Sequence, residues 1–327
     1  MKVALGVISP AEAWAMPRRF ADRLRRDFPQ HEFVDAWERE DLRRALQDAD
    51  AAFAAVVDRD LVPSLTRLRW IQAPAAGVGH LLSAELIASP IILTSARGVR
   101  ARAMAEHVLA VTLALARQLP LTMRRQTEHA WALDEVERSG AVRTLAGKRM
   151  GIIGLGAVGR EVARLAAAFG LRVAGARKHA DRPPPEGVDE VFGAARLFDM
   201  LRKSDIVVLA AALTAETELL VNHAALDAVK RGALLVNVGR GRLVDDEAVV
   251  AALADGRLGG AALDVFTKEP LAPDSPYWDL PNVIVTPHTS GTMEDYWTPL
   301  VALFSENLRR FESGRPLLNV VDKAAGY

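Results

Sequence analysis

The chain has 327 residues, a length that exceeds one ordinary hydrophobic core and suits two α/β domains. Half of the residues are apolar and a quarter are charged, the balance of a soluble globular protein, and 41 basic residues match 41 acidic ones. A formal net charge of zero predicts no overall attraction to nucleic acid or anionic lipid, and the absence of cysteine excludes disulfides, zinc-thiolate sites and thiol nucleophiles.

The N-terminus superficially resembles a signal peptide, because Lys2 and an apolar run precede the tripeptide AWA at 13–15. The run from Val3 to Ile8 is short for a signal sequence, contains Gly6 and is followed by an arginine-rich stretch. We therefore expect it to form the first buried strand of a cytoplasmic protein. Since no apolar run approaches the length of a membrane span, we expect no membrane association.

Short apolar runs alternate with amphipathic stretches over the first hundred residues. Strands are expected within residues 2–8, 31–37, 51–57, 69–81 and 90–96, and helices over 11–28 and 39–50. Strands separated by helices imply βαβ crossovers and a parallel sheet. A long helix with an apolar face is then expected over roughly residues 102–118.

The pattern restarts after Lys148 in a more regular form. Strands are expected at 149–154, 171–176, 189–192, 205–211, 233–238, 260–266 and 282–287, with helices between most of them. These strands suffice for a complete doubly wound parallel sheet of the Rossmann type. Residues 293–314 indicate one long helix ending at Gly314, which we expect to pack back on the first domain.

We therefore predict two doubly wound α/β domains, the second inserted in the first. A flavodoxin-like domain would comprise residues 1–99 and 290–327, and a Rossmann domain residues 100–289. The chain would cross between them twice, near 96–100 and 289–291, which predicts a two-strand hinge.

A glycine-rich turn opens the second domain. The segment GLGAVG places Gly154, Gly156 and Gly159 in G-x-G-x-x-G spacing between a predicted strand and a predicted helix. The first glycine allows a tight turn, the second lets backbone approach a pyrophosphate, and the third allows close packing of helix on strand. Free N–H groups at the helix start would face the phosphates. A glycine turn without a ligand is the alternative, but the agreement of strand, glycines and helix favours a dinucleotide site.

The next strand ends at Arg177, about 20 residues after the first glycine, where an NAD site carries an acidic residue for the ribose hydroxyls. A guanidinium there matches the oxygens of the 2′-phosphate of NADP, and Lys178 would add a second positive charge. An arginine in solvent beside an ordinary NAD site is the alternative. We expect NADP(H) to be preferred, with NAD(H) possible.

Three further polar sites stand at or soon after the ends of predicted strands. Arg240 follows one strand, Asp264 and Glu269 follow the next, and His288 follows the last. Ligands bind at the carboxyl ends of strands in open α/β sheets, so these residues can converge. Arginine can hold a substrate carboxylate, histidine can carry a proton near neutral pH, and a carboxylate can orient the histidine. Taken singly, a surface ion pair, a simple turn and a loop histidine would explain them equally well.

The motifs as a set resemble the D-isomer-specific 2-hydroxyacid dehydrogenase family. The resemblance covers almost the whole chain, in the family's order and spacing. It is carried by GLGAVG, SDIVVLAAALTAET, VNVGRGRLVDDEAV, GAALDVFTKEPL and TPHTSG, and in the first domain and the C-terminal part by LRWIQAPAAGVGHL, TSARGVRARAMAEHVLA and ENLRRFESGRPLLNVVD.

The resemblance implies roles for particular residues. Arg240 would bind the carboxylate and carbonyl of a 2-oxo acid, His288 would be the general acid and base, and Glu269 would pair with His288. Asp264 would contact the nicotinamide end of the site. Backbone N–H groups of the substrate domain would also hold the substrate carboxylate, at Ala75, Ala76 and Gly77. The remaining cofactor-binding positions implied are Ala157, Val158, Thr217, Val238 and Gly291.

Besides Arg177, which replaces the family's usual acidic residue, the chain departs from the family at three further places. Ala212 stands where the family often has proline, and Gly79 where it often has aspartate. Arg100 stands where many members carry an aromatic or aliphatic residue near the cleft. If Arg100 points inward it could favour a second anionic group on the substrate, but we expect it to lie in solvent.

The resulting hypothesis is an NADPH-preferring enzyme that reduces small 2-oxo acids, such as glyoxylate or hydroxypyruvate, to D-2-hydroxy acids. One alternative is an NAD-dependent member, for example of the phosphoglycerate type, against which Arg177 counts. Another is a corepressor-like protein that senses a dinucleotide without catalysis. The neutral net charge counts weakly against that alternative.

A homodimer is expected, because residues 129–148 resemble the dimerisation region of family members. Trp131 would be an interface anchor there, although a core tryptophan is the more common case. No metal site is expected, since the seven histidines lack ligand spacing. We assign no chemistry to His80 or His107, and we expect the other four non-catalytic histidines to lie on the surface, namely His31, His129, His179 and His223.

Overall fold

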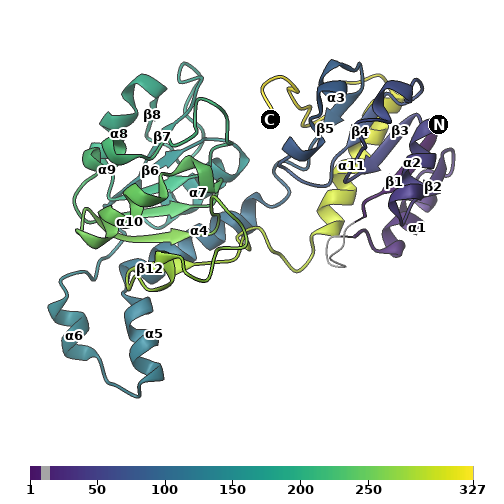
Figure 1. Ribbon diagram of the computed structural model, residues 1–327. Coiled ribbons are helices and arrows are strands. Elements are labelled where there is room, and N and C mark those ends of the chain that lie inside the picture. Colours follow the sequence, from purple (N-terminus) through teal and green to yellow (C-terminus); the bar gives the residue numbers. More distant parts are fainter. Residues whose placement is uncertain (9–14, 327) are drawn as a thin grey trace. The chain divides into compact units, whose positions relative to one another are not determined.

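The computed structural model describes residues 1–8 and 15–326 and divides the chain into two compact units (Figure 1). Unit 1 is Met1–Val99 with Met293–Tyr327, and unit 2 is Arg100–Thr292. Each unit is built on a parallel sheet with helices packed against it, so the predicted fold class is confirmed. The assignment of unit 1 to the substrate and of unit 2 to the cofactor stays a prediction.

Unit 1 contains a five-stranded sheet in the order β2-β1-β3-β4-β5, with every pairing parallel. This is the 2-1-3-4-5 order of flavodoxin-like folds. The strands are β1 (Lys2–Gly6), β2 (Glu32–Asp35), β3 (Ala51–Ala54), β4 (Trp70–Gln72) and β5 (Ile92–Thr94). The α-helices of this unit are α1 (Arg18–Asp27), α2 (Arg39–Asp48), α3 (Ala84–Ala88) and α11 (Trp297–Glu312).

Helix α1 begins later than the sequence pattern predicts. The expected helix over 11–28 starts at Arg18, directly after Pro17, while residues 11–14 of that prediction lie outside the described residues. A proline disfavours helical backbone in the residue before it, and Met16 accordingly bonds through its N–H to the carbonyl of Val7 at 3.0 Å. Pro17 therefore sets the start of the helix.

Helix α11 packs on the sheet of unit 1 through aromatic rings. Phe304 stacks on Phe53 and on Trp70, with ring centroids 4.6 and 5.3 Å apart. The indole N–H of Trp70 donates to the hydroxyl of Thr94 at 2.8 Å, so this buried donor is satisfied. The C-terminal segment thus completes the core of the unit that the N-terminal segment begins.

One histidine is buried that we expected on the surface. The His31 side chain is 2% exposed, and its ring stacks on Phe28. Its Nε2 lies 3.3 Å from a carboxylate oxygen of Glu312, at the end of α11. The surface prediction was wrong because it rested on neighbours in sequence, whereas Glu312 reaches His31 only through the tertiary fold.

Unit 2 contains a seven-stranded parallel sheet in the order β12-β11-β10-β9-β6-β7-β8. The strand order reverses at β6 and β9, the switch point where ligands bind in such sheets. The strands are β6 (Arg149–Ile153), β7 (Arg172–Ala176), β8 (Glu190–Phe192), β9 (Ile206–Leu209), β10 (Ala233–Asn237), β11 (Leu258–Leu263) and β12 (Val283–Val285).

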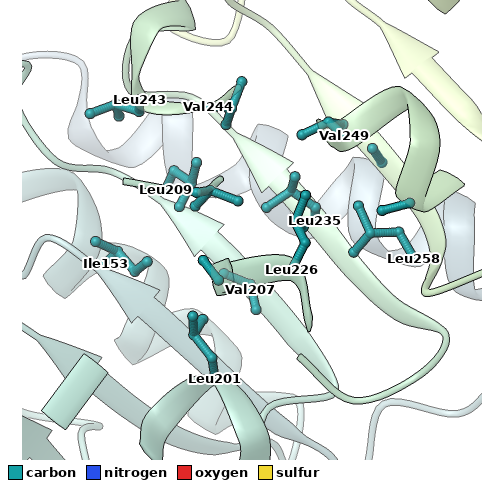
Figure 2. Packing of buried hydrophobic residues seen from close by; sticks show 14 of the residues in the cluster. Ile153, Leu201, Val207, Leu209, Leu226, Leu235, Leu243, Val244, Val249 and Leu258 are labelled. Carbon is teal, nitrogen blue, oxygen red and sulfur yellow. The ribbon is translucent and has the colours of Figure 1, made fainter. Parts of the chain in front are cut away.

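The helices of unit 2 cover both faces of its sheet. On one face, valine and leucine side chains from the central strands pack against α8 (Leu197–Lys203), α9 (His223–Ala228) and α10 (Asp246–Ala254), as Figure 2 shows. On the other face, α4 (Ala101–Ala116) packs against α7 (Ala157–Ala168), and buried residues of both helices belong to one hydrophobic cluster. Phe169 follows the last residue of α7 and is exposed.

Two short helices stand away from this core. Figure 1 shows α5 (Leu119–Thr127) and α6 (Leu133–Arg138) extending from the sheet of unit 2, and neither buries a residue. Arg125 of α5 joins Glu135 of α6 through a two-pronged ion pair, with N–O distances of 2.8 and 2.9 Å. We call residues 119–142 the arm. None of the described helices, in the arm or elsewhere, is long and apolar enough to cross a lipid bilayer.

Candidate active site

The carboxyl ends of all seven strands in unit 2 are in register with one another. The paired residues form one row across the sheet, in the order Val285, Leu263, Asn237, Leu209, Ile153, Ala176 and Phe192. The residues that follow this row therefore share one edge. They include Gly154, Arg177, Val238 and Asp264, four of the positions predicted from the sequence, together with Thr286, which was not predicted.

The glycine turn follows β6, the central strand of this row. Gly154 has φ 98°, and a Cβ there would lie 2.7 Å from the backbone of Ala210 and Ala211 after β9, so only glycine fits. A Cβ on Gly159 would collide with the carbonyl of Gly154, whereas one on Gly156 would meet open space. The backbone at Gly156 can thus be approached from outside.

Helix α7 begins at this turn with its amide groups uncapped. Gly156 is the N-cap residue and supplies no side-chain oxygen, so no side chain caps the first turn at Ala157 and Val158. Their N–H groups and the positive end of the helix dipole are suited to an anion such as a pyrophosphate. Turn, open approach and helix start together fit a dinucleotide.

Two basic residues follow β7, next to β6. The Arg177 guanidinium donates to the carbonyls of Arg182 and, at 2.9 Å, of Pro183, within its own loop. Its Nε is buried and has no partner among the described residues. Lys178 pairs with Glu216 at 3.0 Å, from the loop after β9. Because β7 and β9 flank β6, this ion pair reaches across the strand end that carries the glycine turn.

Arg240 lies three residues beyond β10, on the other side of the switch point. Its guanidinium donates to the carbonyl of Gly239 at 2.6 Å, and it forms no ion pair with any acidic residue in the described ranges. The Asn237 side chain holds this turn, accepting from Gly239 N–H at 3.0 Å and donating to the Arg240 carbonyl at 3.0 Å. An exposed arginine on a braced turn is available to an anionic ligand.

The Arg240 turn lies directly against the segment that carries Glu269. Gly241 is so close to Phe266 that a Cβ would collide with the carbonyl carbon of Phe266 and with Thr267 N. Any side chain at position 241 would push the two turns apart. Glycine here sets the separation between Arg240 and the Glu269 segment.

His288 and Glu269 form a hydrogen-bonded pair. The Nδ1 atom of His288 lies 2.8 Å from Oε2 of Glu269, and Oε1 of Glu269 accepts from the N–H of Phe266 at 2.9 Å. A carboxylate only accepts, so Nδ1 carries a hydrogen and Nε2 is the nitrogen left to exchange a proton with a ligand. The His288 side chain is 54% exposed, so a ligand can reach it.

Asp264 is 1% exposed and holds the loop that carries His288. Its carboxylate accepts hydrogen bonds from the Thr286 hydroxyl at 2.6 Å, from Thr289 N–H at 2.8 Å and from Ser290 N–H at 3.0 Å. The sequence did not predict that Asp264 holds this loop, because the family resemblance assigned Asp264 only to contact with the nicotinamide. His107 of α4, to which we assigned no chemistry, lies 3.4 Å from the Thr286 hydroxyl.

The other predicted cofactor positions differ in which side-chain or backbone groups are available to a cofactor. The Thr217 hydroxyl is engaged in its own turn, donating to the Ala212 carbonyl and accepting from Thr214 N–H, each at 2.8 Å. The Val238 side chain is 3% exposed and belongs to the core, so only its backbone is available. At Gly291 a Cβ would lie 2.9 Å from the Arg100 side chain.

The predicted carboxylate-binding loop lies in unit 1 and begins three residues beyond the end of β4. Of Ala75, Ala76 and Gly77, none donates a backbone hydrogen bond to another residue of the described ranges. The carbonyl of Ala75 accepts a hydrogen bond from Ala96 N–H at 2.9 Å, so the loop is held through a carbonyl and not through its N–H groups. Successive free N–H groups in a turn suit an anion. Within residues 1–8 and 15–326, no group of three potential metal ligands is close enough to hold an ion.

A doubly wound sheet with a glycine turn and a histidine–carboxylate pair at its carboxyl edge defines a dinucleotide-dependent enzyme. Comparison with known proteins agrees. A sequence model of the D-isomer specific 2-hydroxyacid dehydrogenase NAD binding domain matches residues 109–290. A glyoxylate reductase from Aeropyrum pernix is 32% identical, covering 89% of this chain and 90% of its own.

Two crystal structures are similar along the whole chain. One is a D-isomer specific 2-hydroxyacid dehydrogenase from Xanthobacter autotrophicus in complex with NADPH and MES, with a TM-score of 0.84, 30% identity and coverage of 100% and 99% of the two chains. The other is an NADPH-dependent glyoxylate/hydroxypyruvate reductase from Sinorhizobium meliloti in complex with NADP and sulfate, with a TM-score of 0.81 and the same identity and coverage. The present chain belongs to the D-isomer specific 2-hydroxyacid dehydrogenase family. It is an oxidoreductase, and its cofactor is a nicotinamide dinucleotide.

Proposed function

We propose that this protein reduces small 2-oxo acids of the glyoxylate or hydroxypyruvate type to D-2-hydroxy acids, with NADPH as the preferred cofactor. The observation that carries the proposal is the pairing of His288 with Glu269 at 2.8 Å, on the same sheet edge as Arg240 and the glycine turn. The reductase relatives support the substrate class.

In this proposal the chain binds and orients the acid and handles one proton. Arg240 holds the carboxylate and carbonyl of the 2-oxo acid, and the amide groups of Ala75, Ala76 and Gly77 supply further donors to the carboxylate. A nicotinamide cofactor, when bound, would supply the hydride for the carbonyl carbon. His288, protonated on both nitrogens, delivers its Nε2 proton to the carbonyl oxygen, so no free alkoxide forms. Glu269 orients the ring and stabilises its charged form.

The preference for NADPH rests on the loop after β7. Position 177 holds an arginine where an NAD site would place a carboxylate, and its buried Nε lacks a protein partner in the described part of the chain. Lys178 is the second cation of this loop, and it is held by Glu216. We propose that Arg177 and Lys178 bind the 2′-phosphate of the cofactor, and that the open backbone at Gly156 receives the pyrophosphate.

The experiment that tests this function compares kcat/KM for NADPH and NADH across a panel of 2-oxo acids. We expect turnover of glyoxylate or hydroxypyruvate, with NADPH favoured. Equal or better use of NADH would be expected of an NAD-dependent member. That result would contradict the preference for NADPH but would be compatible with the reduction of 2-oxo acids. Tight cofactor binding with no turnover of any 2-oxo acid would instead support a dinucleotide sensor.

The variant His288→Gln separates the chemical role from binding. Glutamine keeps a polar side chain of similar reach but cannot carry a proton. We expect kcat to fall by about 10²- to 10⁴-fold while the Kd of NADPH stays within a factor of two. Retained turnover would remove His288 from the mechanism.

We also propose roles for the two units and for the arm. Unit 2 would bind the cofactor, and unit 1 would contribute to binding the substrate. The arm would bury its apolar side chains against a second copy of this chain, because Trp131 is 91% exposed and Met123 and Leu133 are more than half exposed. A core role for Trp131, the alternative that the sequence left open, does not fit that exposure. Large apolar side chains exposed within one short segment are typical of an interface.

A further inference from the structure

A half-buried series of hydrogen bonds runs from α4 to the loop that carries His288. It begins at His107 on α4, passes through the Thr286 hydroxyl directly after β12, and ends at the Asp264 carboxylate directly after β11. The distances are 3.4 Å from His107 Nε2 to Thr286 Oγ1 and 2.6 Å from Thr286 Oγ1 to Asp264 Oδ1. None of these groups has a role in the proton and hydride steps described above.

The hydrogen bonds of this series all donate in one direction, from His107 toward Asp264. A carboxylate only accepts, so the single hydroxyl hydrogen of Thr286 goes to Asp264. The Thr286 oxygen must then accept from His107, which places a hydrogen on Nε2 of that ring. Burial lowers the pKa of His107, so the ring is neutral near neutral pH and this bond selects its tautomer.

Thr286 and Asp264, at the far end of this series of hydrogen bonds, fix the backbone of His288. Asp264 and Thr286 both offer their main-chain carbonyls to the N–H of His288, at 2.9 and 3.0 Å. His288 has φ 56°, a left-handed conformation that costs a non-glycine residue free energy and persists only where its surroundings enforce it. The Asp264 carboxylate also binds the two N–H groups that follow His288, at Thr289 and Ser290.

We infer that His107 is a positioning residue for the reaction, acting through Thr286 and Asp264 to hold the His288 loop in its left-handed conformation. The inference rests on the proposed function of His288 as the proton donor. His107 itself touches no reacting atom, so its effect is on the placement of His288 and not on the binding of the cofactor.

Single and double variants test the inference by steady-state kinetics. Thr286→Val keeps the shape of the side chain and removes the hydroxyl, and we expect kcat for reduction to fall by about 10- to 100-fold because His288 is misplaced. His107→Leu should lower kcat by about three- to tenfold, the loss of one hydrogen bond. Thr286→Ser and His107→Gln retain a hydroxyl and an N–H donor, so both should restore most of the rate.

The double variant His107→Leu/Thr286→Val gives the discriminating result. If the two residues act in series, its kcat equals that of Thr286→Val alone, since His107 has nothing left to donate to. The isotope effect with NADPH deuterated at the transferred position should rise in the slow variants, and the Kd of NADPH should stay within a factor of two. A smaller folded fraction would lower the apparent kcat without raising the isotope effect. Thermal unfolding of each variant is therefore measured alongside.

Independent effects that multiply in the double variant would overturn the inference, as would a slow rate in Thr286→Ser equal to that of Thr286→Val. His288→Gln serves as the reference. If it retains turnover, the proposed function of His288 fails. If it loses turnover while the Thr286 and His107 variants keep theirs, only the positioning role fails.

Discussion

The Nδ1 atom of His288 and the Oε2 atom of Glu269 are 2.8 Å apart, although the two residues follow different strands of the sheet in unit 2. Glu269 in turn is oriented by the N–H of Phe266. Phe266 lies against Gly241, the residue after Arg240. Arginine, glutamate and histidine are therefore held by one set of adjoining turns at the carboxyl edge of the sheet.

Glu269→Gln tests the role of the carboxylate in this pair. The amide can still accept a hydrogen bond from Nδ1 but cannot stabilise a positive charge on the ring, so we expect kcat for 2-oxo acid reduction to fall about 10-fold or more. The Kd of NADPH should not change, as measured by fluorescence titration. Glu247→Gln on α10 is the matched control and should keep the wild-type kcat. An unchanged rate in Glu269→Gln would contradict the assigned role.

Arg177→Ser tests the cofactor preference. Removing a charged donor to a phosphate costs about 1.5–3 kcal/mol, so kcat/KM for NADPH should fall by about 10- to 100-fold while the value for NADH changes little. The measurement is the ratio of the two kcat/KM values with one 2-oxo acid. Arg202→Ser on α8 removes an exposed arginine elsewhere and should leave the ratio unaltered. A parallel fall with both cofactors would show that Arg177 serves the fold of its loop instead.

Glu216→Gln tests the ion pair that crosses the end of β6. Glu216 holds Lys178 at 3.0 Å and places a negative charge near the proposed phosphate site. Both side chains are exposed, so the expected gain is small. KM for NADPH should drop about two- to fivefold at low salt, and this gain should shrink as ionic strength rises. A higher KM for NADPH would indicate that Glu216 helps to place Lys178 for binding.

Glu161→Gln tests an ion pair that ties α7 to α4. The Arg164 guanidinium, with Arg102 of α4 as a second partner, lowers the pKa of Glu161 from 4.5 to about 2. Because the pKa is lower in the folded state, the carboxylate stabilises the fold fully above pH 4.5, and that contribution is lost as pH falls toward 2. Urea unfolding should show a loss of about 1 kcal/mol at pH 7, after allowance for screening of partly exposed partners. The gap between variant and wild type should narrow from pH 4.5 downward, and a gap independent of pH would contradict this account.

Trp131→Arg tests the proposed dimer. A large exposed side chain at the centre of an interface contributes about 2 kcal/mol or more to association, so the variant should shift the dimer toward monomer. Sedimentation velocity over a range of concentrations measures the shift. Phe198→Arg, on α8 and away from the arm, is the control and should leave association unaltered. A wild-type protein that sediments as a monomer at all concentrations would remove the proposal.

Local sequence determined the architecture and the class of cofactor, a dinucleotide. The alternation of apolar runs and amphipathic stretches depends on short-range periodicity, so it predicted both parallel sheets without knowledge of any long-range contact. The glycine turn was readable for the same reason. Gly154, Gly156 and Gly159 are needed by backbone geometry within one strand, turn and helix. The polar residues that follow the strand ends could be expected to lie at one edge because a parallel sheet brings its carboxyl ends together.

The tertiary structure alone decided which side chains meet. Asp264 was readable as a polar residue after a strand, but its burial and its three bonds to the His288 loop depend on how β11 and β12 are set side by side. His107 reaches Thr286 across a distance in sequence that no local pattern spans, and His31 is buried for the same reason. Hydrogen bonds and burial are properties of neighbours in space, and packing of distant segments sets those neighbours.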